Sequence, residues 1–456
     1  MNSRAQAWLR EPLTRHLTWT IAFSVMIAAL LWPALWNGFP IVFDDTGGYL
    51  ARPFEGSLLF GRSAFYGAFL ALGIPLDFWP TIVAQSALVV WLVVLTLRIQ
   101  GFGGRPSLAV VVVIGLSGLT SFPWFASQLM PDVLAPVAAL AIYLLAFRVP
   151  VMRQREKVVL GIVVAVAMAS HMATLALSVA IVAFLALVRP FSAELRLPRL
   201  HLAPAALAVA VGVLLAPLSN LAIAGRFAFT PGGANFVFGR LIESGIVARY
   251  LSEKCPDPKI KLCVFRDDLP ATGDEWLWGE ASPLRKLGGT DSFGAEAQRI
   301  ALTSLLLYPG QHLTTGLTSA TEQFFNVGNG YVIGPVHWHA KWTLERYAPE
   351  AINTLLRSRQ EETQLDLSWL SIVHVPIAYL AIAALPVVVM FAARRGIRPV
   401  AIALSMTSLA ALLANAAICG SFAVPTDRYQ NRLVPLALFA TGLVVLARWR
   451  LPSRKL

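Results

Sequence analysis

The sequence predicts an all-α polytopic membrane protein with about ten membrane-embedded helices and a large, mainly helical extracytoplasmic loop. Of 456 residues, 57% are hydrophobic and 14% are charged, whereas a soluble domain has about 25% charged residues. Several apolar runs reach roughly 20 residues, the length that a helix needs to cross the hydrocarbon core of a bilayer. A third observation, the distribution of basic residues between loops, agrees with repeated crossing.

The formal net charge of +12 reports topology. Nineteen Lys and Arg residues, with three Glu, fall in the N-terminal segment and in alternate short loops; the rest of the chain has 18 basic and 22 acidic residues, so the two sides carry +16 and −4. This asymmetry is the positive-inside pattern and predicts cytoplasmic termini. It argues against nucleic-acid binding and favours a multi-pass protein of the bacterial inner membrane, with membrane lipids as partners.

Nine apolar runs are the expected membrane segments: 17–36, 77–98, 107–122, 131–147, 158–188, 201–224, 369–393, 399–419 and 432–448. The first run is too long for the apolar core of a signal peptide, and no small-residue cleavage site follows it. The run 158–188 begins and ends at basic clusters, so it has to leave and return. We expect two short helices meeting at His171, which makes ten helices.

The remaining segments define three parts of the chain. Residues 1–224 are an N-terminal transmembrane module whose first outer loop is 37–76, residues 225–368 are an extracytoplasmic loop domain, and residues 369–456 are a C-terminal transmembrane module. In the first outer loop, 62–70 is an amphipathic stretch that could lie along the membrane surface. In the long loop, helical periodicity covers 296–307 and 340–356.

Two adjacent carboxylates, Asp44 and Asp45, follow the first membrane segment. Ionisable groups at a membrane are costly and therefore suggest function. One of them could simply cap a helix, but capping needs one Asp, and Gly47-Gly48 is a poor helix start. The pair could instead supply a general base, and a divalent metal ion shared by both carboxylates is a further reading.

Arginines on the outer side do not follow from the positive-inside pattern, so Arg428 and Arg432 are informative. Guanidinium groups match the geometry of phosphate, and residues four apart share one face of a helix. The alternative is an ion pair with Asp427 or contact with lipid headgroups. Arg62, in the first outer loop, belongs to the same set of candidate phosphate-binding residues.

Two other polar residues stand at the edges of apolar segments. Asp132 follows Met130-Pro131, a good helix start, so a structural role and a catalytic role are both open. His171 lies at the expected turn between two short helices, where it could contact a substrate or be a buried, hydrogen-bonded histidine.

Two cysteines, Cys255 and Cys263, close a short Pro-rich loop in the long outer segment. In an oxidising compartment this spacing predicts a disulfide. A zinc site would need more ligands nearby.

Three segments, taken together, resemble the GT-C superfamily of membrane glycosyltransferases, which use polyprenyl-phosphate-linked sugars. The segment 45–49 is similar to the acidic motif of that family, an Asp followed four residues later by Tyr, here Tyr49. The segment 308–313 is similar to a Pro-centred segment before a juxtamembrane helix, and 428–435, with Tyr429, to an Arg-Tyr segment entering a late span. Thr46 and Ser63-Ala64 depart from the family pattern.

The resemblance implies a GT-C-like fold and inverting sugar transfer on the outer face of the membrane. By it, Asp45 or Asp44 would deprotonate the hydroxyl of a glycan, lipid or protein acceptor, and Arg428, Arg432 and Arg62 would stabilise the leaving lipid phosphate. Tyr49, His171, Tyr429 and Asp132 would contact substrate. Some relatives use a divalent metal ion and others use none.

Two other functions remain as alternatives. A transporter or flippase of a lipid-linked or anionic substrate would need charged or helix-breaking positions at mid-membrane depth, whereas polar residues here gather at one edge. An outer-loop binding or assembly protein, with a structural acidic pair, is the third possibility.

Overall fold

The computed structural model describes residues 3–448 except 60, 231, 330–332, 363–364, 367 and 393–397. Among the basic residues of the predicted cytoplasmic side, five lie outside the described residues: Arg394, Arg395, Arg450, Arg454 and Lys455. Within the described part of the chain there is no β-strand, and two isolated bridges join Ile41 to Gln128 and Leu59 to Arg62.

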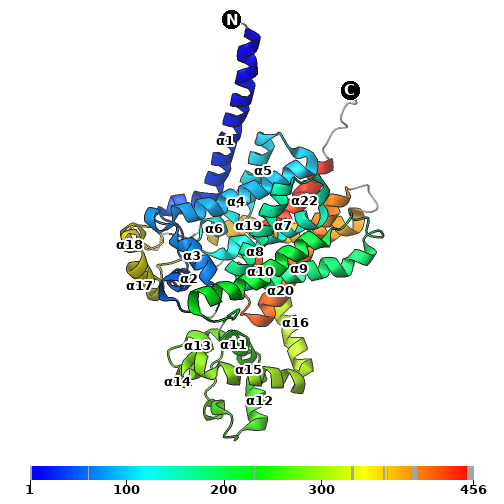
Figure 1. The fold of residues 1–456 in the computed structure, drawn as a ribbon. Helices are drawn as coiled ribbons and strands as arrows, with labels where there is room; N and C mark the ends of the chain where they lie inside the picture. The colour runs from blue at the N-terminus through cyan, green and yellow to red at the C-terminus, as the bar shows by residue number, and fades with distance from the viewer. Residues whose placement is uncertain are drawn as a thin grey trace.

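Ten apolar helices form one bundle (Figure 1). In the described residues, seven helical segments are long and apolar enough to cross a membrane, which confirms a helical protein of multi-pass character. The helices are α1 (Ser3–Asn37), α4 (Trp79–Leu97), α5 (Pro106–Leu119), α7 (Leu134–Phe147), α8 (Gln154–Ser170), α9 (Met172–Val188), α10 (Leu202–Ala224), α19 (Ser371–Ala392), α20 (Pro399–Phe422) and α22 (Val434–Arg448).

The expected break at His171 is present. The helix α8 ends at Ser170 and α9 begins at Met172, with His171 in extended conformation between them (φ −153°, ψ 121°). The two helices pack against each other and against α7 and α10. All residues of α7, from Leu134 to Phe147, are buried, because it lies in the centre of the bundle.

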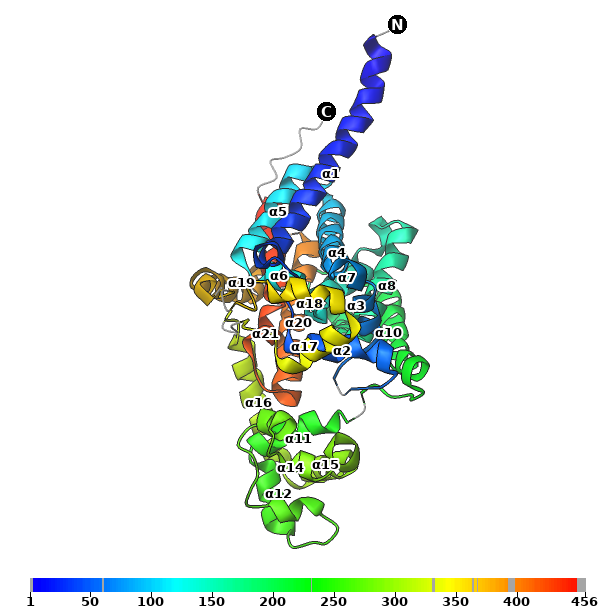
Figure 2. The same cartoon turned by 90° about the vertical axis from the view of Figure 1, so that its left-hand side faces the viewer.

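Short helices pack on the bundle beside α1. They are α2 (Asp44–Glu55), α3 (Ala64–Ala71), α6 (Phe122–Ser127), α17 (Trp338–Tyr347), α18 (Pro349–Leu356) and α21 (Asp427–Asn431). In both ribbon views α17 and α18 lie against α2 and α3 (Figures 1 and 2). The predicted helix 340–356 is two helices, because Pro349 begins the second.

The stretch 62–70, expected to be amphipathic, contains a helix that is packed within the protein. Ser63 caps α3 by accepting hydrogen bonds from the backbone N–H groups of Phe65 and Tyr66. Tyr66 and Leu70 are fully buried, since α3 packs between α2, α8 and α10.

A separate lobe projects from one side of the bundle (Figure 2). It is built from α11 (Ala234–Glu243), α12 (Ile246–Lys254), α13 (Gly273–Trp278), α14 (Pro283–Lys286) and α15 (Gly289–Leu307). The lobe has its own core, in which Phe238, Trp276 and Phe293 pack edge to face or tilted, with ring centroids 5.2–5.4 Å apart.

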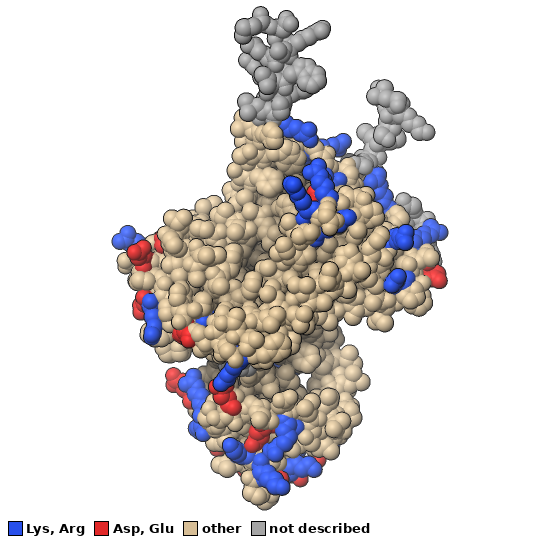
Figure 3. Space-filling model, viewed as in Figure 1, with Lys and Arg blue, Asp and Glu red and all other residues tan. Residues whose placement is uncertain are grey.

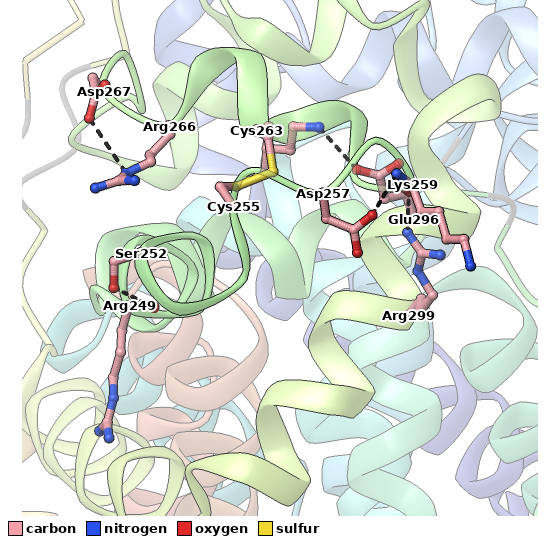
Figure 4. Close-up of a disulfide and its surroundings, with 11 residues drawn as sticks. Arg249, Ser252, Cys255, Asp257, Lys259, Cys263, Arg266, Asp267, Glu296 and Arg299 are labelled. Carbon is pink, nitrogen blue, oxygen red and sulfur yellow. Dashed lines mark hydrogen bonds and ion pairs between the residues drawn. A yellow bond between two sulfur atoms is a disulfide. The ribbon is translucent and has the colours of Figure 1, made fainter.

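The predicted disulfide between Cys255 and Cys263 closes a loop at the tip of the lobe (Figure 4). Two hydrogen bonds tie that loop to α15: Glu296 accepts from the N–H of Leu262 at 3.1 Å, and Arg299 donates to the carbonyl oxygen of Lys259 at 2.8 Å.

The predicted domain 225–368 divides into parts with different surroundings. Residues up to Leu307 belong to the lobe, whereas α16 (Pro309–Phe325) packs along α20 of the bundle and α17 packs on α2. Charged residues are sparse over the middle of the bundle and gather at its two ends and on the lobe (Figure 3). A broad uncharged belt of this kind is expected where lipid surrounds the protein.

Candidate functional site

The helix α2 begins at the acidic pair. Asp44 and Asp45 occupy its first turn, where carboxylates interact favourably with the positive end of the helix dipole. Thr46 fixes the start of this helix, because its hydroxyl accepts from the N–H of Phe43 at 3.0 Å and donates to the carbonyl oxygen of Leu129 at 3.1 Å. The expectation that Gly47-Gly48 disfavours a helix here is wrong.

A close helix contact explains Gly47. A Cβ atom at this position would lie 2.7 Å from the Cα atom of Ala340 in α17, a distance that side chains do not adopt. Glycine therefore lets α17 pack directly on the helix that carries Asp45.

Asp45 lies between two arginines. Its Oδ1 atom forms an ion pair with Arg62, and its Oδ2 atom lies 3.6 Å from Nη2 of Arg428. The three side chains are partly accessible, with 20% of Asp45, 14% of Arg62 and 11% of Arg428 exposed. A carboxylate and two guanidinium groups thus share one accessible position.

A second carboxylate, Asp132, forms the base of this cluster. Its Oδ1 atom lies 2.9 Å from Nη1 of Arg432 and 3.8 Å from Nε of Arg428. Arg432 also donates to Oδ1 of Asn415 at 2.9 Å. We name these five ionic side chains (Asp45, Arg62, Asp132, Arg428 and Arg432) the charged cluster; it has a formal charge of +1.

The structure places Arg432 differently from Arg62 and Arg428. Arg432 and Asp132 are both completely buried, so Arg432 compensates the internal carboxylate and has no accessible surface for a substrate phosphate. Arg428 connects the buried and the accessible halves of the cluster, because it contacts both Asp132 and Asp45. The expected alternative, an ion pair of these arginines with Asp427, does not form: Asp427 accepts from the N–H of Gly328 at 2.9 Å.

Asp44 does not join the charged cluster. Its side chain is exposed and accepts a hydrogen bond from the N–H of His337 at 3.3 Å. The two carboxylates therefore have different partners, which separates their roles. Over the described residues, no group of three or more His, Cys, Asp and Glu side chains could hold a metal ion.

The remaining candidates surround the cluster. The guanidinium group of Arg62 lies 5.9 Å from the ring centre of Tyr49, and Arg428 and Arg432 lie 5.3 and 5.4 Å from the ring centre of Tyr429. Burial raises the pKa of Tyr49, so its hydroxyl stays protonated and can act as a donor. His171 is half-buried, with Nδ1 3.1 Å from the hydroxyl of Thr174, and Asp132 and Arg432 are among its electrostatic neighbours.

A small recess borders Arg62. Its wall is largely apolar and comes from α8, α9, α10 and the segment before α3; Leu59, Met172, Ala216, Asn220 and Phe229 line it. The charged side chain of Arg62 therefore lies beside a mainly apolar wall.

Sequence reasoning missed two supporting side chains. Asn415 lies inside an apolar segment, and a polar residue there is a signal for an internal partner; it accepts a hydrogen bond from Arg432 and donates to the carbonyl oxygen of Tyr429 at 2.8 Å. Gln360 binds both backbone groups of Val42, just before Asp44. No local pattern marks it, because its partner is 318 residues away.

The arrangement combines an accessible carboxylate, which can accept a proton, with guanidinium groups that can neutralise an anion beside it. Comparison of the chain with known protein families, with curated proteins and with solved structures finds no match.

Proposed function

We propose that the chain is a membrane glycosyltransferase that moves a sugar, with inversion, from a polyprenyl-phosphate-linked donor to an acceptor hydroxyl on the outer face of a bacterial inner membrane. The observation that carries the proposal is Asp45 between Arg62 and Arg428 at the outer end of the bundle. A base and an anion-binding pair are the two functions that this reaction needs at one place.

In this mechanism Asp45 accepts the proton of the acceptor hydroxyl while the oxygen attacks the anomeric carbon. The bond from that carbon to the phosphate oxygen breaks, and the lipid phosphate leaves with the electron pair. Arg62 and Arg428 stabilise the charge that develops on the phosphate. Asp132 and Arg432 act from beneath, by holding Arg428 in place.

The proposal includes the topology that charge favours. Both termini lie on the cytoplasmic side, ten helices are embedded in the membrane, and the fold is GT-C-like. Arg98, directly after α4, and Glu156, in the first turn of α8, form an ion pair of 2.6 Å, and both lie on the side that charge predicts to be cytoplasmic.

A transporter or flippase is the second candidate. It is favoured by the buried Asp132–Arg432 pair at the start of α7 and α22, because buried charges within membrane bundles often belong to transport pathways. The accessible position of Asp45 at one end of the bundle favours one-sided chemistry instead.

The test is Asp45→Asn, which removes the base and keeps the size of the side chain. Cells with no chain, with the wild type and with the variant are compared by mass spectrometry of envelope glycans and lipids. We expect the glycans of the variant cells to match those of the null cells, because loss of a general base lowers the rate by about 10²–10⁴-fold. Normal glycans would refute the assignment of Asp45.

Glu55→Gln is the matched control, since Glu55 lies in the same helix and also pairs with an arginine, Arg52 at 2.9 Å. Asp44→Asn separates the two adjacent carboxylates, and we expect a smaller loss because Asp44 contacts neither arginine of the accessible half. A null strain with unchanged glycans and altered solute uptake would support the transporter.

A further inference from the structure

The corner between α15 and α16 exposes a row of leucines. Exposed fractions reach 83% for Leu306, 63% for Leu313 and 60% for Leu317. We name the set Leu302, Leu305, Leu306, Leu313 and Leu317 the leucine edge; all five are exposed. Scattered exposed leucines are ordinary on a protein surface, whereas a contiguous set indicates a binding surface.

The leucine edge lies in a stretch of sequence without charge, and the charged residues of α12 reach it at one point, where Glu253 accepts from Tyr308 at 2.7 Å and Arg249 donates to Gln311 at 3.3 Å. No Asp, Glu, Lys or Arg stands between Arg299 and Glu322, although the rest of the lobe has many charged residues. In Figure 3 the charged residues of the lobe gather away from the side where α16 runs in Figure 1. Charged side chains are unfavourable in the hydrocarbon region, so a helical stretch with none of its own is compatible with contact with lipid.

Several polar groups along this surface have hydrogen-bond partners within the protein. The hydroxyls of Thr303, Thr314 and Thr321 donate to carbonyl oxygens four residues earlier in their own helices, at 2.7, 3.0 and 2.8 Å. His312 lies 3.1 Å from the hydroxyl of Ser304, and burial lowers its pKa, so it is neutral near pH 7. Such groups can leave water at little cost.

The helix α16 packs against the bundle. A Cβ atom at Gly420 of α20 would lie 2.5 Å from the carbonyl oxygen of Ser319, so α16 and α20 are in direct backbone contact. At the end of α16, Tyr379 donates to the carbonyl oxygen of Phe325 at 2.9 Å. Tyr379 belongs to α19, whose Ile372 and Leu380 are 79% and 70% exposed on the outside of the bundle.

We propose that the leucine edge is a membrane-contact surface that rests in the outer leaflet of the bilayer that surrounds the bundle. The occupant is lipid, because the five leucines are exposed, their own stretch of sequence has no charged residue, and the surface continues through Phe325 into the apolar outside of α19. The lobe is then supported at two places, by its chain connections to the bundle and by the lipid surface.

This contact has a consequence for the charged cluster. Gln323, in the last turns of α16, exchanges two hydrogen bonds with Thr426: it donates to the carbonyl oxygen at 2.8 Å and accepts from the N–H at 2.9 Å. Thr426 lies two residues before Arg428. Lipid that fixes α16 therefore also fixes the segment that presents Arg428 to Asp45.

The test measures depth and requires no knowledge of activity. Leu306→Cys and Leu313→Cys are prepared in the full chain, labelled with a nitroxide and reconstituted in nanodiscs of phosphatidylethanolamine and phosphatidylglycerol. Relaxation by oxygen, which concentrates in lipid, is compared with relaxation by a water-soluble nickel complex. Leu380→Cys on α19 is the lipid control, and Asp291→Cys, in the first turn of α15, is the water control.

The native cysteines do not interfere, since Cys255 and Cys263 are joined and Cys419 is buried; the unsubstituted chain measures any background. We expect oxygen to exceed nickel several-fold at Leu306 and Leu313, as at Leu380, and the reverse at Asp291. Nickel access equal to that at Asp291 would place the edge in water and overturn the proposal. Protection from both agents would show a protein partner or a second copy, which also overturns it.

Discussion

Arg432 and Asp132 form an ion pair of 2.9 Å in which both side chains are completely buried. Asp132 precedes α7 and Arg432 precedes α22, so the pair joins the N-terminal and C-terminal parts of the bundle. Burial of a single charge is strongly unfavourable, and loss of one partner of a buried pair typically lowers stability by about 3–5 kcal/mol.

We therefore expect Asp132→Ala to lower the free energy of unfolding by about 3 kcal/mol or more, because Arg432 keeps its charge without its partner. The double variant Asp132→Leu, Arg432→Met should be the milder of the two, since it leaves no buried charge. Thermal unfolding in detergent gives both values. Asp267→Asn is the control, because its partner Arg266 is exposed and 3.8 Å away, and we expect a change of less than about 1 kcal/mol. Equal losses in the single and double variants would contradict this reasoning.

The sequence predicted the positions of Asp132 and Arg432 at segment edges but not their pairing. Hydrophobic runs place a residue along the membrane normal, and both residues fall at outer ends of apolar segments. Which helices become neighbours depends on packing between residues 300 positions apart, and no local pattern contains that information. For the same reason Arg432, expected among the accessible phosphate-binding residues, lies buried against Asp132.

The two hydrogen bonds of Gln360 to Val42 fix the residues just before Asp44. Oε1 accepts from the N–H of Val42 at 3.1 Å, and Nε2 donates to its carbonyl oxygen at 2.6 Å. Gln360→Ala removes both partners from buried backbone groups, so we expect a loss of about 1–3 kcal/mol. Hydrogen exchange of the amides at 42–46 should accelerate. Gln298→Ala, at an exposed position of α15, is the control. Unchanged exchange at Val42 in Gln360→Ala would contradict the role of these two hydrogen bonds.

The helices themselves were easier to predict than their contacts. The break at His171 followed from charge and length, and the disulfide of Cys255 with Cys263 from spacing. The helix through Gly47-Gly48 was missed, because local propensity disfavours glycine and the reason for it lies in Ala340 of another helix.

In the lobe, the hydroxyl of Tyr308 donates to Oε2 of Glu253 at 2.7 Å. This hydrogen bond lowers the pKa of Glu253, and Arg249 contributes in the same direction. A lowered pKa in the folded state means that the stabilisation is present above the unfolded pKa and disappears as pH falls through the folded value. We expect acid to lower the melting temperature of the wild type more than that of Tyr308→Phe, when both are measured at pH 6 and below pH 4. Parallel acid profiles would contradict a role for this bond.

The close contact of Gly47 with Ala340 predicts that alanine at position 47 lowers stability. A methyl group at Gly47 would meet the Cα atom of Ala340 at 2.7 Å and the hydroxyl of Thr343 at 3.2 Å, so α2 and α17 would have to separate. Overpacking of this kind typically lowers stability by about 1–3 kcal/mol, which outweighs the gain of up to about 1 kcal/mol that alanine brings to a helix. Gly294→Ala in α15, where the nearest atom is Nδ2 of Asn235 at 3.7 Å, should show the opposite sign. Thermal unfolding of the two variants decides the matter: if both were stabilised, the close approach of α17 to the helix that carries Asp45 would be wrong.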